Sequence, residues 1–175
     1  MMQKYYAHKL SSGENNVVIA LSDTECGKLF SGDTRSDIGS ETEKMKFANS
    51  VNDLVVKFKR LDHDEGSHSE MLVMERLYPL DYRSYEVEKR ELIIEVFEDE
   101  LKQLHSAGFI HHDIKRPATE KGEPYDNVFL TGKGIRLIDV GISVLRSQVG
   151  DKLFERYLDE ERKELVEFKK YFLER

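Results

Sequence analysis

The hydrophobic pattern of the chain changes its period near Tyr85, and this change restricts the folds that it can adopt. Before this point the apolar residues form short runs of the kind found in strands. After it they recur at steps of one, three and four, which is typical of long amphipathic helices. Strands first and helices afterwards predict an α+β protein with a cleft between its two halves.

The first half is expected to contain short strands separated by polar turns that are rich in Gly, Asn and Ser. The expected strands are Tyr5 to Leu10, Val17 to Leu21, Cys26 to Phe30, Leu54 to Phe58 and Met71 to Leu77. One helix is expected around Ser40 to Val51, because its acidic start suits a helix N-terminus.

The second half is expected to begin with a long helix that ends near Gly108, a residue that favours helix termination. A hairpin should follow, with strands Asn127 to Leu130 and Ile135 to Ile138. The segment Asp151 to Arg175 is helical by pattern. We expect this last helix to cover the apolar face of the first one, formed by Leu92, Val96, Phe97 and Leu104.

The composition fits an intracellular globular protein. Apolar residues make up 39% of the chain, and a single cysteine, Cys26, is typical of a reducing compartment. A net charge of -7 without a basic run argues against nucleic acid as the main partner. The sequence contains no apolar run near the ~20 residues of a membrane span and no secretory signal pattern. We therefore expect a cytoplasmic protein, or one that acts inside a host cell after signal-free export.

Three short segments of the second half carry the residue types that phosphoryl transfer requires. They read IHHDIK at 110–115, DNVFL at 126–130 and LIDVG at 137–141. Asp113 is expected to orient the attacking hydroxyl, and Lys115 to stabilise charge on the transferred phosphate. Asn127 and Asp139 offer the oxygen ligands that Mg²⁺ prefers. His111 is expected to be a core histidine bonded to the backbone near Asp139.

In this order the three segments resemble the catalytic loop, the following asparagine with its strand, and the Asp-Phe-Gly motif of protein kinases. The resemblance extends into the first half. There Gly13 stands in a segment similar to the glycine-rich loop, followed by Val18. Lys28 matches the strand lysine that contacts the α- and β-phosphates. Glu43 stands where the family places the partner of that lysine, with Glu41 as the rival.

The strand that ends at Leu77 resembles the one that enters the kinase hinge. The resemblance implies that Met74 lines the back of the adenine pocket. It also implies that the backbone of Glu75 and of Leu77 bonds the adenine edge. ATP and Mg²⁺ are the expected cofactors, and residues 1–77 and 78–175 the expected N-lobe and reduced, mainly helical C-lobe of a single two-lobed domain.

The sequence departs from the family pattern in four places. Ser11 and Asn16 replace two loop glycines, and His112 stands where arginine is usual. An insertion, 116–126, separates Asp113 from Asn127, and at the usual spacing the asparagine position holds Ala118. Only residues 142–175 follow the magnesium motif, too few for a normal activation segment and the helices that dock peptides. Small bacterial and viral effector kinases and RIO-like kinases show comparable truncation.

Three functions are compatible with these residues. The first is ATP- and magnesium-dependent phosphorylation of Ser or Thr hydroxyls in a protein, favoured by Lys115, and assisted by a partner because the docking helices are missing. The second is a kinase-shaped pseudokinase that binds nucleotide, or nothing, and acts by contacting another protein. The third is a small-molecule phosphotransferase, although such enzymes usually have a large helical substrate lobe.

Overall fold

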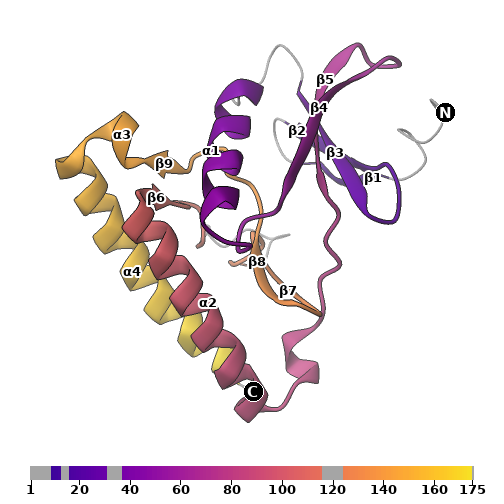
Figure 1. The fold of residues 1–175 in the computed structure, drawn as a ribbon. Helices are drawn as coiled ribbons and strands as arrows, with labels where there is room; N and C mark the ends of the chain where they lie inside the picture. Colours follow the sequence, from indigo (N-terminus) through magenta and orange to yellow (C-terminus); the bar gives the residue numbers. More distant parts are fainter. Residues whose placement is uncertain (1–8, 13–15, 31–36, 116–123, 175) are drawn as a thin grey trace.

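The computed structural model describes residues 9–12, 16–30, 37–115 and 124–174, which form a mixed α+β structure. A five-stranded antiparallel sheet and helix α1 lie at one end, and helices α2 and α4 lie at the other (Figure 1). The α+β prediction is confirmed at this level. None of the described helices is long and apolar enough to cross a membrane.

The large sheet has the strand order β1-β2-β3-β5-β4. Its strands are β1 (Lys9–Ser12), β2 (Asn16–Ala20), β3 (Glu25–Phe30), β4 (Phe58–Asp64) and β5 (Ser69–Glu75). Strand β3 lies in the centre, where Lys28 pairs with Val18 of β2 on one side and Leu72 of β5 on the other. This central strand therefore fixes the position of Lys28 from both sides.

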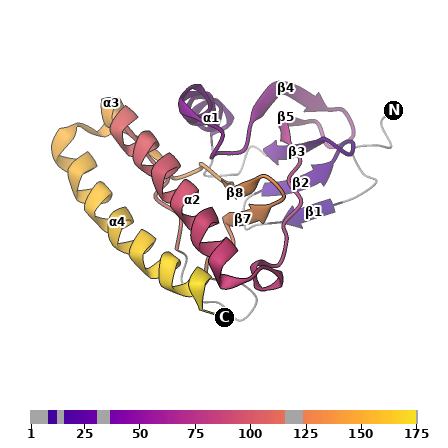
Figure 2. The same ribbon diagram turned by 60° about the horizontal axis from the view of Figure 1, so that its bottom comes forward.

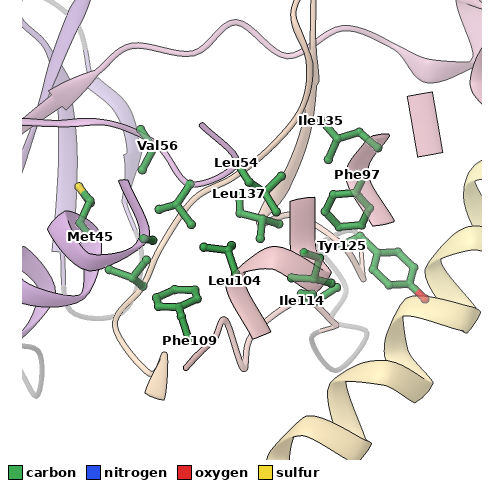
Figure 3. Packing of buried hydrophobic residues seen from close by; sticks show 14 of the residues in the cluster. Met45, Leu54, Val56, Phe97, Leu104, Phe109, Ile114, Tyr125, Ile135 and Leu137 are labelled. Carbon is green, nitrogen blue, oxygen red and sulfur yellow. The ribbon is translucent and has the colours of Figure 1, made fainter. Parts of the chain in front are cut away.

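The strand expected at Leu54 to Phe58 is wrong, because the fourth strand begins only at Phe58. The preceding apolar residues are fully buried and link the sheet to the rest of the molecule. Val56 donates its amide to the Leu137 carbonyl at 2.9 Å, and Leu137 donates to Leu54 at 2.8 Å. Figure 3 shows Leu54 and Leu137 in one cluster with Leu104. The segment forms a single parallel bridge, from Val55 to Leu137, and its burial explains its apolar sequence.

Helix α1 (Ile38–Val51) begins at Asp37, whose side chain accepts a hydrogen bond from the Gly39 amide at 2.9 Å. The helix is attached to the crossing segment by Asn49, which donates to the Val55 carbonyl and accepts from the Phe58 amide at 2.9 Å. These bonds replace the ladder that a regular strand would have provided, and they fix the helix beside the sheet.

Helix α2 (Val87–Ala107) ends at Gly108, which has a φ of 103° and a left-handed conformation that glycine adopts readily. The short 3₁₀ helix η2 (Tyr82–Ser84) precedes it. Helix α4 (Asp151–Leu173) runs along α2 (Figures 1 and 2), and the rings of Phe97 and Phe168 meet edge to face at 5.4 Å. The predicted end of α2 near Gly108 and the predicted final helix are confirmed.

The prediction that the last helix covers the whole apolar face of α2 is only partly correct. Phe97 and Leu104 are buried, but the side chains of Leu92 and Val96 are 65% and 57% exposed. Successive helical residues are about 100° apart, so no single neighbouring helix can cover the whole of this apolar arc. Helix α4 covers the side that carries Phe97, and α1 and β8 also contact α2.

Two small sheets connect these parts. Strands β7 (Val128–Thr131) and β8 (Gly134–Leu137) form the predicted hairpin, which lies between α2 and the large sheet (Figure 2). Strand β6 (Phe109–Ile110) pairs with β9 (Val144–Leu145), which leads into the short helix α3 (Arg146–Val149) and then α4. Only a few residues therefore separate the turn after β8 from the last helix.

Candidate functional site

Lys28 is the centre of the first group of charged residues. Its Nζ lies 2.9 Å from Glu41 Oε1 of α1 and 3.6 Å from Asp139 Oδ1, in the turn after β8. Lys28 and Glu41 are buried, whereas the side chain of Asp139 is 40% exposed. The structure thus brings together two residues that the sequence predicts for one site, although 111 positions separate them.

The partner of Lys28 is Glu41, and the prediction of Glu43 is wrong. Helical residues two positions apart point about 200° away from each other, so only one of the two glutamates can face β3. Glu43 is exposed and accepts a hydrogen bond from Gln148 Nε2 at 3.3 Å. The second carboxylate oxygen of Glu41, Oε2, is buried and has no hydrogen-bond partner among the described residues.

The Asp139 carboxylate is stabilised in its ionised form. Burial would raise its pKa, but the charge of Lys28, the amide of Gly141 and the charge of His111 outweigh this effect and lower the pKa below its usual value. The Gly141 amide donates to Asp139 Oδ1 at 3.1 Å. Asp139 has a φ of 61°, which is uncommon for a residue other than glycine. Such conformations cluster at functional sites.

The loop 111–113 is held by Glu161, which comes from the middle of α4. The amides of His111 and His112 donate to the two carboxylate oxygens of Glu161 at 3.1 and 2.7 Å. His105 Nε2 lies 2.8 Å from the same carboxylate. Burial would raise the pKa of Glu161, but the hydrogen bond and charge of His105 and the neighbouring donors lower it. Glu161 therefore acts as a charged anchor for this loop.

His111 connects the two parts of the site, as the sequence predicts. Its Nε2 lies 2.8 Å from the carbonyl of Ile138, directly before Asp139. Its own carbonyl accepts from the Ser143 hydroxyl at 2.7 Å. The ring of His112 packs against Tyr157 of α4, with 4.3 Å between centroids, and His112 has a positive φ of 70°. The loop is thus constrained at the two residues that precede Asp113.

Asn127 contacts Asp113 despite the long insertion between them. Its Nδ2 donates to the carbonyl of Asp113 at 3.0 Å and to Oδ2 at 3.1 Å. Its carbonyl accepts from the Ile138 amide at 3.0 Å, which places it beside Asp139. Ala118, at the shorter spacing, lies outside the described residues. The DNVFL match rather than the spacing therefore identifies the residue that joins Asp113.

The residues fit a magnesium ion only in part. The amide nitrogen of Asn127 is bound to Asp113, which leaves its side-chain oxygen as the atom that can bind a metal, and Asp139 supplies an ionised carboxylate. The described residues contain no group of three or more His, Cys, Asp and Glu side chains with metal-ligand geometry. A Mg²⁺ ion usually keeps several waters and takes further oxygens from substrate phosphates, so two protein ligands are sufficient in such sites.

Lys115 is engaged in an ion pair and is not a free cation at the candidate site. Its Nζ forms an ion pair with Glu167 of α4, and its side chain is 44% exposed. The hydrogen bond and the charge of Glu167 raise the pKa of Lys115. To approach a transferred phosphate, Lys115 would first have to leave Glu167. An exposed pair of this kind contributes little energy, so such a movement is feasible.

The residues predicted to bind the nucleotide lie near β3 and β5, except Gly13, for which the structure gives no description. Met74 is buried, and Val18 and Leu77 pack against the same core. Gly13 lies outside the described residues. The Glu75 amide already donates to the Lys57 carbonyl at 2.9 Å, and the Glu75 carboxylate binds Arg136. The carbonyl of Glu75 accepts a long hydrogen bond from Cys26 Sγ at 3.6 Å.

A cavity of about 310 Å³ lies away from these residues, between η2, β7 and the end of α4. Aromatic side chains dominate its lining, including Tyr82, Tyr125 and Tyr171. None of the predicted site residues is among the described residues that line it. The cavity therefore does not mark the group formed by Lys28, Asp113 and Asp139.

Sequence reasoning missed Glu161, although the sequence contains a signal for it. It lies on the apolar face of the last helix, at helical spacing from Leu158, Leu165 and Phe168, and it is 1% exposed. A glutamate inside an apolar stripe is almost never fully buried without a partner, so it indicates a buried polar contact. Lys44 was missed as well: it is buried in α1 and donates to the Gly141 carbonyl at 3.2 Å.

Comparison with known proteins adds no family assignment. No protein-family model matches this sequence, and a search of the curated proteins finds no match.

Proposed function

We propose that the protein transfers the γ-phosphoryl group of ATP to Ser or Thr hydroxyls of a protein, with Mg²⁺ as cofactor, in a two-lobed kinase-like fold. The observation that carries the proposal is the group of Lys28, Glu41, Asp139 and Asp113. Lys28 is paired with a buried glutamate 3.6 Å from the Asp139 carboxylate, and Asp113 is bonded to Asn127 beside Asp139. Phosphoryl transfer depends mainly on such positioning and on charge stabilisation.

Each residue has a distinct task in this proposal. Lys28 binds the α- and β-phosphates, and Glu41 keeps its ammonium group oriented. Asp113 accepts the proton of the attacking Ser or Thr hydroxyl. The oxygen of that hydroxyl forms a bond to the γ-phosphorus, and the bond between the γ-phosphorus and the ADP oxygen breaks. Asn127 orients Asp113, and with Asp139 it would hold Mg²⁺, which neutralises charge on the phosphates. Met74, Leu77 and Val18 would enclose the adenine ring.

A partner protein is part of the proposal, but its role is narrower than the sequence implies. The Lys28–Glu41 pair is present in the isolated chain, so a partner is not needed to form it. Between Gly141 and α4 the chain forms only the short elements β9 and α3. The partner would therefore position the substrate rather than rearrange the site.

The alternative is a pseudokinase that binds nucleotide and acts as an interaction module. The observation that favours it is the ion pair of Lys115 with Glu167, which removes the second expected cation from the site. A pseudokinase of this kind would bind nucleotide without transferring phosphate.

Two measurements on the full chain separate these functions. Excess Mg-ATP at a hundredfold its Kd should stabilise the protein by about 2.7 kcal/mol, and the melting temperature should rise accordingly. Radiolabelled ATP should transfer phosphate to the chain itself or to a generic protein substrate, and only with Mg²⁺. Stabilisation without transfer would support the pseudokinase. An unchanged melting temperature would contradict both functions.

A further inference from the structure

Lys44 differs in its environment from Lys46, the other lysine of α1. It is 8% exposed, whereas Lys46, two positions later on the same helix, is exposed. Its Nζ donates to the carbonyl of Gly141 at 3.2 Å. The carboxylates whose charges act on Lys44 are Glu41, Glu43 and Asp37, all on or beside α1. This side chain therefore connects α1 to the turn that carries Asp139.

The turn Asp139–Gly141 contacts ammonium groups from two different elements. Lys28 of β3 approaches Asp139 Oδ1 at 3.6 Å, and Lys44 of α1 bonds the Gly141 carbonyl at 3.2 Å. Glu41, one helical turn before Lys44, pairs with Lys28. The ion pair and the turn are consequently fixed to the same face of the same helix.

Burial of Lys44 has a cost that its local contacts do not offset. Burial lowers the pKa of Lys44, although Glu41, Glu43 and Asp37 act in the opposite direction. Burying a charged ammonium group costs free energy that burying an apolar side chain of similar volume does not. A lysine that stability alone does not require, placed behind the metal-binding turn, points to a role in the site.

We propose that Lys44 is a positioning residue that holds the Asp139 turn against α1, so that the Lys28–Glu41 pair and Asp139 stay aligned without modification of the chain. The proposal deepens the kinase function above and rests on it for its catalytic consequence. Residues 142–150 alone connect Gly141 to α4, so this bond, rather than a long segment between them, would align the turn.

The first test measures the turn directly and needs no activity. Hydrogen exchange of peptides that cover 139–145 reports on the Gly141 amide, bound to Asp139 Oδ1, and on the Ser143 amide, bound to the Val140 carbonyl. In Lys44→Met these amides should exchange about tenfold faster than in the parent chain. Lys44→Arg, which keeps a charged donor, and Lys46→Met, the exposed control, should exchange like the parent.

The second test measures catalysis in the same variants. Lys44→Met should lower kcat for phosphate transfer by about ten- to a hundredfold, because small misplacements of reacting groups have effects of this size. Lys44→Arg should restore most of the rate. The melting temperature of Lys44→Met should stay close to that of the parent, which separates positioning from loss of structure. If Lys44→Met does not fold, Lys44→Gln takes its place in both measurements.

The outcomes separate this proposal from the proposed function. Unchanged exchange in 139–145 for folded Lys44→Met would overturn the role of Lys44, even if the parent is an active kinase. Unchanged kcat with faster exchange would overturn its catalytic consequence. If the parent neither binds Mg-ATP nor transfers phosphate, the kinase function fails, and exchange still decides whether Lys44 holds the turn.

Discussion

The two loops that meet at the candidate site are held by opposite charges from opposite ends of the molecule. The loop 111–113 is bonded through its amides to the carboxylate of Glu161 in α4. The turn 139–141 is held by ammonium groups of β3 and α1, from Lys28 and Lys44. One loop is therefore coupled to the helical end of the protein and the other to the end that contains the large sheet (Figure 1).

The carboxylates at the two loops also differ in whether a ligand can reach them. Glu161 is buried and its acceptors are occupied by backbone amides and by His105, so it cannot meet a substrate. Asp139 is partly exposed, and Lys28 approaches one of its carboxylate oxygens at 3.6 Å, so its carboxylate remains accessible to another ligand. The pKa of each carboxylate is lowered, but by hydrogen-bond donors in one case and by a neighbouring lysine in the other.

The largest effect is expected from removing the carboxylate that holds the first loop. Glu161→Ala would leave two amides and His105 buried without an acceptor, and losing one partner of such a group costs about 3–5 kcal/mol. The melting temperature should fall on the order of 10 °C for a chain of this size. Glu160→Ala, an exposed neighbour on the same helix, is the control and should change little.

The pH dependence of stability gives a second view of the same residue. The pKa of Glu161 in the folded protein lies below its ordinary value of 4.5, so its contribution is present above that value and is lost as the pH falls through the lower pKa. The parent should lose stability in acid more steeply than Glu161→Gln does. Parallel acid-unfolding curves for the two proteins would contradict the charged anchor.

The second largest effect concerns the functional contrast between the loops. Asp139→Ala should abolish phosphate transfer and also weaken Mg-ATP binding, because Asp139 is an expected metal ligand. Asp113→Ala should abolish transfer but spare nucleotide affinity, because the role proposed for Asp113 is to accept the proton of the attacking hydroxyl. Titration of each variant with Mg-ATP, followed by melting temperature, gives the affinities. Equal weakening by both substitutions would show that the two loops do not divide the work in this way.

The pair Glu41 and Glu43 offers a matched test within one helix. Glu41→Gln removes the charge that pairs with Lys28 at 2.9 Å and should lower transfer about tenfold or more. Glu43→Gln changes an exposed side chain and should leave activity within about twofold of the parent. The rates of both variants, measured at saturating Mg-ATP, decide the assignment. A larger loss in Glu43→Gln would restore the original sequence-based choice.

The sequence predicted those parts of the molecule that depend on local pattern. The end of α2 at Gly108, the hairpin β7–β8 and the final helix follow from periodicity and turn residues. The Leu54 to Phe58 strand failed because an apolar run has the same sequence in a strand and in a buried crossing segment. Only the three-dimensional partner, here Leu137, distinguishes the two cases.

The site was predictable as far as it depends on motifs, and it was missed where it depends on helix rotation or burial. Asp113, Asn127 and Asp139 were predicted from short segments, and Lys28 from its resemblance to the strand lysine of protein kinases. The choice of Glu43 over Glu41 failed because the sequence does not show how α1 is rotated about its axis. Lys44 and Lys46 look alike in sequence, and only packing makes one buried and the other exposed.

The smallest expected effect comes from Glu164, one helical turn after Glu161 in α4. Burial, followed by the charges of Glu161, Glu167 and Glu160, raises the pKa of Glu164 to about 7, and Lys115 opposes the shift only in part. In the part of the chain that the structure describes, no hydrogen bond supports its carboxylate. Two glutamates on one helix thus have pKa values shifted in opposite directions, one with donors and one without.

The sign of the effect on stability follows from the proton count. Between the ordinary value of 4.5 and about 7 the folded state binds more protons at Glu164 than the unfolded state. This residue therefore favours folding at the lower end of the window, and the advantage disappears as the pH rises through it.

At pH 8 Glu164→Gln should melt a few degrees higher than the parent, a small gain because the site is only half-buried and solvent screens its charge. The difference between the two melting temperatures should shrink towards pH 5. A parent that gains stability relative to Glu164→Gln between pH 5 and pH 8 would show that Glu164 has a donor, and the contrast with Glu161 would then be lost.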